Sequence, residues 1–183
     1  VYDAFSNAIE SEFETGAALA IEHQGNMIVN LWGGHQDAQK TKAWEENTLV
    51  NVFSVTKGVT ATCISRLIDQ GKLDPGKRVG YYWPEYSCNG KEDTKVSDLL
   101  CHRAAMFGFK EGIPLGSFQD WNKFIQQLQL QTPYRKPGIS QGYHALTFGW
   151  LVGELIRRVD GRSVGQYFKE EIAEPLNIDF HIG

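Results

Sequence analysis

Cysteine is scarce in this sequence, and the three that occur, Cys63, Cys88 and Cys101, are odd in number and widely spaced. This pattern argues against a disulfide framework or a zinc site, and it is typical of reduced thiols in a cytoplasmic protein. No Asn-x-Ser/Thr glycosylation acceptor occurs, which agrees with that compartment. No run approaches the roughly 18 apolar residues of a membrane span, and the first residues lack a secretory signal pattern. We therefore expect a cytoplasmic protein with no membrane partner.

A strong excess of either charge is also missing. The 18 Lys and Arg residues nearly balance 22 Asp and Glu residues, and the formal net charge of −4 gives no reason to expect a nucleic acid partner. We expect no metal site and no cofactor, because metal-ligand spacing is absent from the five histidines, His23, His35, His102, His144 and His181. The remaining composition, 42% hydrophobic and 22% charged over 183 residues, is that of a globular protein.

The first fifty residues contain one helical pattern and two strand patterns. Residues 17–23 and 27–32 predict two strands, and Gln24-Gly25-Asn26 between them is a hairpin-turn signal. A lone hairpin is marginal in water, so further strands or covering helices are expected. Before the hairpin, residues 1–14 predict an amphipathic helix with an apolar side made of Val1, Phe5, Ala8, Ile9 and Phe13.

The central stretch of the sequence for function is residues 52–58, Val-Phe-Ser-Val-Thr-Lys-Gly, which contains a candidate nucleophile and a candidate base. A helix is predicted from this stretch to Ile68, and Asp69-Gln70-Gly71 closes it, with Gly71 suited to a left-handed C-terminal cap. Ser54 and Lys57 then lie on one face, with Cβ atoms about 5–6 Å apart. A serine hydroxyl is a poor nucleophile until an adjacent base takes its proton, and the lysine amine is the candidate base. A Ser-x-x-Lys tetrad occurs by chance roughly once in a chain of this size, so the surrounding helix carries much of the argument.

The rest of the chain is predicted to be mostly helical. Residues 72–79 are rich in turn formers, and Trp83-Pro84 extends an irregular connection. Four helices are predicted: 96–101 after an N-cap at Thr94, about 118–129 after an N-cap at Ser117, about 145–159 with Gly161 beyond it, and one from Ser163 to a point before Pro175. The second of these has an inner face made of Trp121, Phe124, Ile125 and Leu128.

A second serine also lies in a short motif. Residues 138–142, Gly-Ile-Ser-Gln-Gly, match the Gly-x-Ser-x-Gly elbow of α/β-hydrolases around Ser140. That elbow needs a buried strand before it, and residues 132–137 contain Pro133 and Pro137, which cannot lie in a central strand. A simple turn is the favoured interpretation. The adjacent carboxylate pairs Glu45-Glu46 and Glu170-Glu171 favour solvated charge, and Asp74 and Asp98 are interpreted as capping groups.

Residues 142–154 add a tyrosine, Tyr143, directly before a buried, glycine-containing helix. With this segment the chain resembles the serine β-lactamase and penicillin-binding-protein superfamily. It is most similar to the branch that holds class C β-lactamases and family VIII carboxylesterases. The resemblance runs over the whole chain and is carried by the hairpin, Ser54-Val55-Thr56-Lys57, Lys72-Leu73-Asp74, residues 98–103 (Asp-Leu-Leu-Cys-His-Arg), the Tyr143 segment and Glu174-Pro175-Leu176.

The resemblance implies three site residues. Ser54 is the acylated nucleophile, Lys57 is its proton partner, and Tyr143 is a second acid or base. A tyrosine, with a reference pKa of about 10, acts as a base near neutral pH only if nearby cations lower that pKa, and Lys57 is the candidate cation. The alternative for Tyr143 is an aromatic residue that packs a loop.

Two departures from the family pattern bear on function. Lactamases of this branch usually carry an asparagine two positions after the tyrosine, where this chain has Ala145, and the loss of that amide favours ester substrates. The family's third motif, often Lys-Thr-Gly, supplies an oxyanion-hole N–H from a later strand. Nothing after Tyr143 matches it, and Lys40-Thr41-Lys42 is in the wrong place. We therefore expect the front part of a longer protein, inactive as an isolated segment.

The combined prediction is an α+β fold, β-lactamase/transpeptidase-like, with an antiparallel sheet flanked by helices. One incomplete domain over residues 1–183 is expected: 1–70 with the hairpin and nucleophile helix, 71–142 mostly helical, and 143–183 with the tyrosine motif. The expected function is a serine hydrolase that acts through an acyl-enzyme on short-chain carboxylic esters. The alternatives are a β-lactamase or D-amino-acid peptidase and a non-catalytic binding or scaffold protein. The expected partners are a small ester or amide and a second polypeptide segment that completes the fold.

Overall fold

The structure, a computed structural model, describes residues 1–113, 116 and 118–183. It contains two compact units, Val1–Asn51 and Val52–Gly183. The first unit holds the antiparallel strand pair, and the second holds helices, so the predicted α+β class is confirmed. The expected internal divisions after residues 70 and 142 stay predictions.

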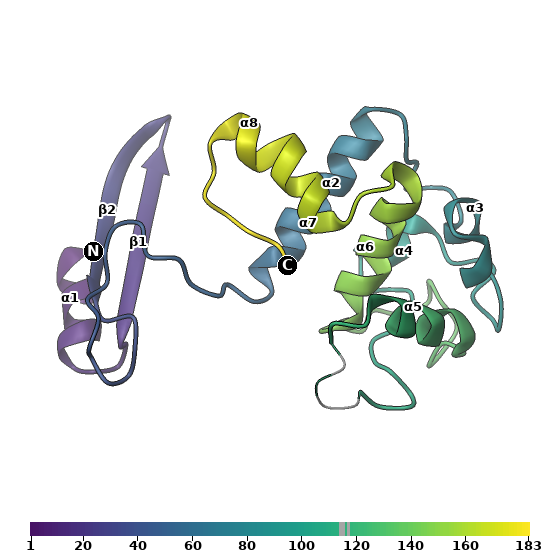
Figure 1. The fold of residues 1–183 in the computed structure, drawn as a ribbon, viewed down its shortest axis with the longest axis horizontal. Helices are drawn as coiled ribbons and strands as arrows, with labels where there is room; N and C mark the ends of the chain where they lie inside the picture. Colours follow the sequence, from purple (N-terminus) through teal and green to yellow (C-terminus); the bar gives the residue numbers. More distant parts are fainter. Residues whose placement is uncertain (114–115, 117) are drawn as a thin grey trace. The chain divides into compact units, whose positions relative to one another are not determined.

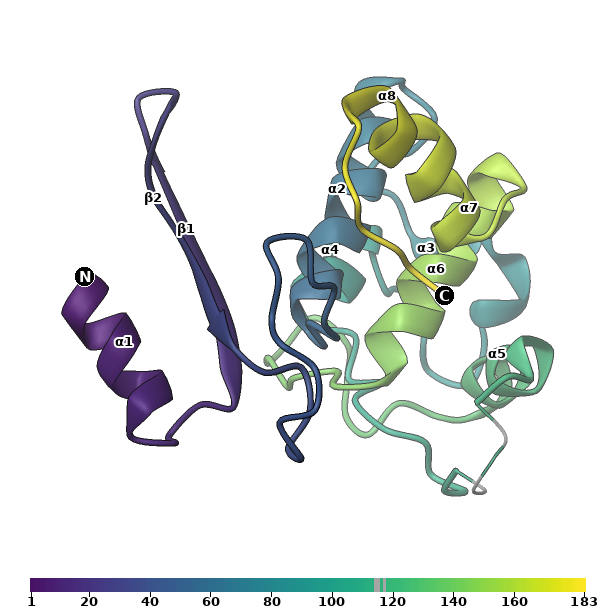
Figure 2. The same cartoon turned by 60° about the vertical axis from the view of Figure 1, so that its left-hand side comes forward.

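The first unit is a helix packed on a β-hairpin. Strands β1 (Gly16–His23) and β2 (Asn26–Gly34) pair antiparallel, and Gln24 and Gly25 adopt the positive φ values of a tight turn. Figure 2 shows the hairpin nearly edge-on, with α1 (Tyr2–Glu10) along one side. The helix lies against β2 at Gly33, where an added Cβ would contact Ile9 and Phe5. The predicted hairpin and its turn are therefore confirmed.

The first helix is shorter than the predicted 1–14. It ends at Glu10 because Glu12 turns left-handed, with a φ of 59°, while the Ser11 hydroxyl donates a hydrogen bond to the Asn7 carbonyl. A serine hydroxyl that bonds the preceding turn competes with further helical bonds. As a result Phe13, assigned to the apolar side of the helix, is 83% exposed.

The second unit is built around a central helix, α6 (Thr147–Asp160), which contacts α2, α3, α4, α5 and α7 (Figure 1). Its other elements follow in chain order: α2 (Val55–Asp69), α3 (Val79–Tyr82), the 3₁₀ turn η1 (Pro84–Tyr86), α4 (Val96–Leu100), α5 (Trp121–Leu130), α7 (Val164–Phe168), the π-helical η2 (Lys169–Ala173) and α8 (Glu174–Leu176). The stretch predicted as an irregular connection therefore contains two short helical turns, α3 and η1.

The hydrophobic core of this unit includes residues of α2, α5, α6 and α7, among other elements. Helix α2 contributes Cys63, Ile64 and Leu67, which follow the predicted helical spacing. Helix α6 is buried over most of its circumference and even encloses a carboxylate, Glu154. That carboxylate accepts hydrogen bonds from Arg157 and Arg158 at 2.7 Å and from the Trp121 indole at 2.9 Å. A buried charge of this kind is tolerated because it is fully paired.

Helix ends in the second unit match the sequence signals in three places. Gly71 and Gly161 have φ values of +69° and +95° and close α2 and α6, as predicted. Ser163 accepts a hydrogen bond from the Gln166 N–H at 3.1 Å and caps α7, as predicted. The predicted inner face of α5 is buried at Phe124, Ile125 and Leu128.

Three other helix ends differ from the predictions. The start of α4 is capped by Asp98, which accepts from the Lys95 N–H at 3.0 Å, rather than by Thr94. Helix α5 begins at Trp121, with Asp120 as its N-cap, so the predicted start at residue 118 is wrong; Ser117 lies outside the described residues. Helix continues past Pro175, because this proline lies in the first turn of α8, where a missing N–H costs no bond.

Over the described residues, no helix is both long enough and apolar enough to cross a membrane. The three cysteines are unpaired, and only Cys63 is buried.

Candidate active site

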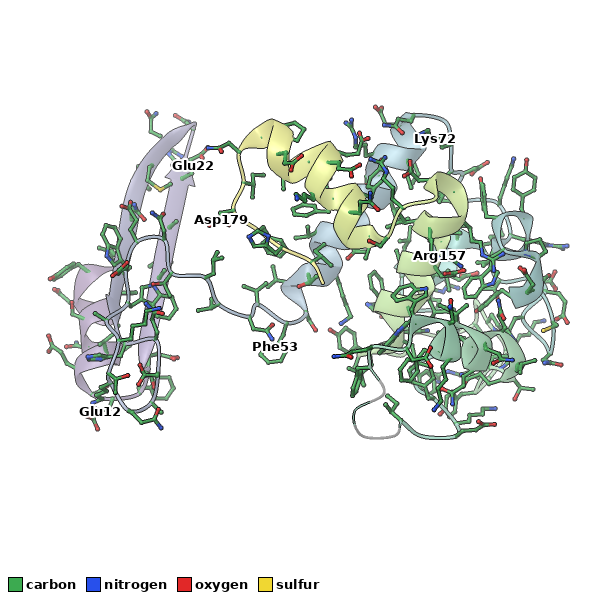
Figure 3. All side chains as sticks on the ribbon, viewed as in Figure 1. Glu12, Glu22, Phe53, Lys72, Arg157 and Asp179 are labelled. Atoms are coloured by element: carbon green, nitrogen blue, oxygen red, sulfur yellow. The ribbon has the colours of Figure 1, made fainter. Side chains whose placement is uncertain are left out.

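Ser54 stands at the N-cap position of α2, and its backbone already has helical values, with φ −72° and ψ −9°. The turn before it closes through hydrogen bonds from Val55 N–H to the Val52 carbonyl and from Thr56 N–H to the Phe53 carbonyl. Phe53 has a φ of 45°, a left-handed conformation that is rare for a bulky residue. Figure 3 labels Phe53 at this turn. Backbone strain of this kind gathers at functional sites.

Lys57 lies one helical turn after Ser54. Its ammonium nitrogen is 3.1 Å from the Ser54 hydroxyl oxygen and donates a second hydrogen bond, at 2.7 Å, to the backbone carbonyl of Ala145. Two acceptors, one on α2 and one just before α6, therefore fix the lysine head. Position 145 was expected to matter because an amide is missing there. The structure places a backbone acceptor at that residue, and no residue-type pattern could have signalled it.

Tyr143 reaches the same hydroxyl from the segment before α6. Its phenol lies 2.7 Å from the Ser54 oxygen, and the Lys57 nitrogen is 5.0 Å from the centre of its ring. The hydrogen bond with Ser54, and then the neighbouring Lys57 ammonium, lower the pKa of Tyr143 below its usual range. The structure thus brings Ser54, Lys57 and Tyr143 together, with one oxygen in contact with both partners. The tyrosine is 55% exposed, so the group is open to a substrate.

The segment that carries Tyr143 is held by a buried histidine. His144 accepts a hydrogen bond from the Met106 N–H at 3.1 Å through Nε2, so Nδ1 carries the proton and donates to the Gly142 carbonyl at 2.6 Å. Burial lowers the pKa of His144 to about 4. Gly142 itself has no room for a side chain, because an added Cβ would meet the Phe107 ring at 2.9 Å. These constraints define the path of the chain on both sides of Tyr143.

The competing motif at Ser140 has a different setting. Residues 131–146, all within the described part of the chain, contain no strand, so the strand that an elbow requires is missing. Residues 138–142 lie in a turn and bend followed by irregular chain, in keeping with the turn interpretation. Ser140 is half-buried in this turn, which ends just before the Tyr143 segment.

Other charged residues singled out in the sequence form ion pairs with residues outside the Ser54 site. Glu170 and Glu171 both accept from Arg162, and Lys40 pairs with Glu12 at 2.5 Å. Within the described ranges, no group of three or more His, Cys, Asp or Glu residues could hold a metal ion.

The Beta-lactamase family model matches residues 5–183 of this chain. The chain is 38% identical to the protein named Esterase/beta-lactamase LipL from Mycobacterium tuberculosis, over all of this chain and 42% of that protein. A crystal structure of a family VIII carboxylesterase superposes with a TM-score of 0.90 at 40% identity, covering 96% of this chain and 48% of the other. A penicillin-binding protein homologue from Caulobacter crescentus gives 0.94 at 36% identity, covering 100% and 49%. The chain thus spans about half the length of the relatives it matches.

Proposed function

This chain belongs to the beta-lactamase family, and from that membership we propose that the protein containing it is a serine hydrolase that forms an acyl-enzyme at Ser54. The observation that carries the proposal is the double contact of one hydroxyl, with Lys57 at 3.1 Å and Tyr143 at 2.7 Å. A serine nucleophile needs a base within hydrogen-bond reach, and Tyr143 satisfies that distance, with the Lys57 ammonium beside its ring.

In the acylation step, the Ser54 oxygen attacks the carbonyl carbon of the substrate and forms a tetrahedral intermediate. Its proton passes to Tyr143, whose phenolate form the Lys57 ammonium stabilises. The proton then leaves from Tyr143 to the departing alcohol oxygen, and the acyl group stays on Ser54. The lowered pKa of Tyr143 supports this role, because a base is most effective when its pKa approaches the working pH.

In the deacylation step, water takes the place of the alcohol. Tyr143 removes a proton from the water as it attacks the acyl carbon, and the proton returns to the Ser54 oxygen as the acid departs. The Lys57 ammonium keeps its second hydrogen bond to the Ala145 carbonyl, which holds it beside the tyrosine ring in both steps. The protein's own residues therefore supply every proton transfer, and no cofactor is needed.

We propose short-chain carboxylic esters as substrates. Ala145 offers no side-chain amide to the amide group that a β-lactam or peptide carries, whereas an ester requires none. The relatives named as esterase and carboxylesterase support the same substrate class. Hydrolysis of β-lactams is the second candidate, favoured by the double name of the Mycobacterium tuberculosis relative.

The experiment is labelling with an active-site-directed fluorophosphonate, followed by mass-spectrometric mapping of the adduct in the full-length protein. Turnover of p-nitrophenyl butyrate and of a chromogenic cephalosporin is measured on the same sample. An adduct on Ser54 with faster ester than cephalosporin turnover is expected. Faster cephalosporin turnover would replace the ester proposal with the β-lactamase alternative. A protein with neither label nor turnover is a binding or scaffold protein, and the proposal is then wrong.

A further inference from the structure

His102 is held in an unusual backbone conformation two residues after the end of α4. Its φ is 59°, in the left-handed region that a non-glycine residue seldom enters. From this position its backbone carbonyl accepts a hydrogen bond from the Gly142 N–H at 2.9 Å. Its ring Nδ1 accepts a second one, at 3.1 Å, from the His144 N–H. One residue is therefore bonded to the chain on both sides of Tyr143.

The His102 ring also contacts the tyrosine itself. The ring centres of His102 and Tyr143 are 4.9 Å apart with planes inclined at 55°, and the ring centres of His102 and Phe148 are 5.2 Å apart. Phe148 is buried in the first turn of α6. The imidazole thus connects the partly exposed phenol ring to a side chain that cannot move without disturbing the core.

The hydrogen bond from His144 also fixes the protonation state of His102. An Nδ1 that accepts a backbone N–H cannot carry a proton, so the ring is neutral, with its hydrogen on Nε2. Burial, and then the positive charge of Lys57, lower the pKa of His102, which keeps this neutral form at neutral pH. The titratable groups that face the ring are Lys57 from α2, and Tyr143 and His144 from the segment before α6.

We propose that His102 is a positioning residue for Tyr143: its neutral ring and its carbonyl hold residues 142–144 so that the phenol stays on the Ser54 hydroxyl. The proposal rests on the proposed function, because the position of the Tyr143 phenol affects catalysis only if Ser54 is the nucleophile. His102 does not contact the serine in this arrangement and acts through the tyrosine.

The first test needs no variant. Imidazole ¹⁵N NMR of the full-length protein at pH 7 should show His102 as the neutral Nε2–H tautomer. A resonance for the Nδ1–H tautomer or the cationic ring would overturn the proposal. This measurement is independent of enzymatic activity and therefore of the proposed function.

The second test uses a matched pair, His102→Asn and His102→Gln. The asparagine oxygen can take the place of Nδ1 and tolerates a positive φ, whereas the glutamine oxygen reaches the place of Nε2 and leaves the His144 N–H unbonded. For p-nitrophenyl butyrate we expect kcat to fall about tenfold further in His102→Gln than in His102→Asn, with KM within about twofold, because one positioning hydrogen bond is lost. Equal kcat values in two folded variants would contradict the proposal.

The third readout follows Tyr143 directly, by ¹³C-tyrosine NMR titration assigned with Tyr143→Phe. The pKa of Tyr143 should rise in His102→Gln and stay close to that of the wild type in His102→Asn. If Ser54 carries no fluorophosphonate adduct, the proposed function fails while this titration still decides the positioning role. A Tyr143 titration that is identical in all three proteins would show that His102 does not position the phenol.

Discussion

Two serines, Ser54 and Ser163, each stand at the N-cap of a helix, but only the Ser163 hydroxyl makes a capping hydrogen bond to its helix. Ser163 has extended backbone, with φ −64° and ψ 159°, and its oxygen bonds back to the Gln166 N–H of α7. Ser54 has helical backbone, with φ −72° and ψ −9°, and its hydroxyl makes no capping bond to α2. Its oxygen is instead contacted by Lys57 and Tyr143.

The difference is set by the backbone and not by the residue type. An N-cap oxygen reaches the N–H two or three residues ahead only when the cap residue is extended. At Ser54 the chain turns one residue earlier, at Phe53 with its φ of 45°, so the serine is already helical. The capping hydrogen bond is given up, and the hydroxyl becomes available for chemistry. Substitutions at Ser54 and at the residues that contact it should therefore affect activity, whereas substitution of Ser163 should affect stability.

The largest effect is expected at Ser54. Ser54→Ala should eliminate ester hydrolysis in the full-length protein, because it removes the oxygen that contacts both Lys57 and Tyr143, while the urea midpoint of unfolding stays nearly unchanged. Ser140→Ala is the control and should stay within several-fold of the wild type in kcat/KM with p-nitrophenyl butyrate. Activity that survives Ser54→Ala and disappears with Ser140→Ala would overturn both the mechanism and the choice of serine.

Substitution of Lys57 should be nearly as severe. Lys57→Ala removes the cation beside Tyr143 and should abolish acylation, measured as the rate of fluorophosphonate labelling. Lys57→Arg should not restore it, because the longer, planar guanidinium cannot occupy the place where the lysine ammonium bonds both the Ser54 hydroxyl and the Ala145 carbonyl. Near-normal labelling of Lys57→Arg would show that charge alone is sufficient.

Tyr143→Phe should slow both steps, with the larger loss in deacylation. The phenylalanine keeps the ring contacts with His102 but has no group to remove a proton from water. Stopped-flow mixing with p-nitrophenyl butyrate should therefore give a burst of product of about one equivalent, followed by a stall. A steady state without a burst, at the wild-type rate, would assign Tyr143 the loop-packing role instead.

His144 should contribute to pH-dependent stability without taking part in catalysis. Its pKa in the folded protein is about 4, below the ordinary value of about 6.5. As pH falls through that window the unfolded chain binds a proton that the folded chain does not, so stability is lost, by about 2–3 kcal/mol. His144→Gln keeps an acceptor for the Met106 N–H and cannot titrate. Urea unfolding between pH 7 and 4.5 should show a flatter dependence for the variant.

The pKa of His102 is lowered in the same direction, so a residual slope should remain in His144→Gln. Identical slopes for the wild type and the variant would mean that the pKa of His144 is the same in the folded and unfolded protein, and the prediction would be wrong.

The smallest change, a modest loss of stability, is expected on substitution of Ser163. Ser163→Ala removes the acceptor for the Gln166 N–H and should cost about 1 kcal/mol of unfolding free energy, with kcat unchanged. Calorimetry and the ester assay measure the two quantities. A Ser163 variant that loses activity but not stability would contradict the structural role assigned to Ser163.

Local patterns predicted much of the fold. The turn at Gln24-Gly25, the caps at Gly71 and Ser163 and the buried face of α2 were all predictable, because each depends on residues close together in the chain. The errors occurred where two local signals compete. The N-cap of α4 is Lys95, whose N–H is bonded by Asp98, rather than the expected Thr94, and the left-handed turn at Glu12 ends α1 early.

In the candidate active site, too, some contacts could be predicted from the sequence and others could not. The spacing of Ser54 and Lys57 follows from one helical turn, so their contact could be predicted from the sequence. The approach of Tyr143, 89 positions from Ser54, entered only through the resemblance to a known family. The Ala145 carbonyl and the bracketing of Tyr143 by His102 could not be predicted, since both depend on backbone groups that every residue possesses.

The anchoring of Lys57 at a backbone carbonyl has an evolutionary consequence. Where a side-chain amide both holds the lysine and meets the substrate, one mutation damages both tasks, and selection keeps the residue fixed. Here the carbonyl of residue 145 is inherited with the chain itself, so its side chain can drift without loosening the ammonium. Libraries randomised at Ala145 should therefore retain many active members and diverge in substrate preference, which makes this position a favourable starting point for directed evolution.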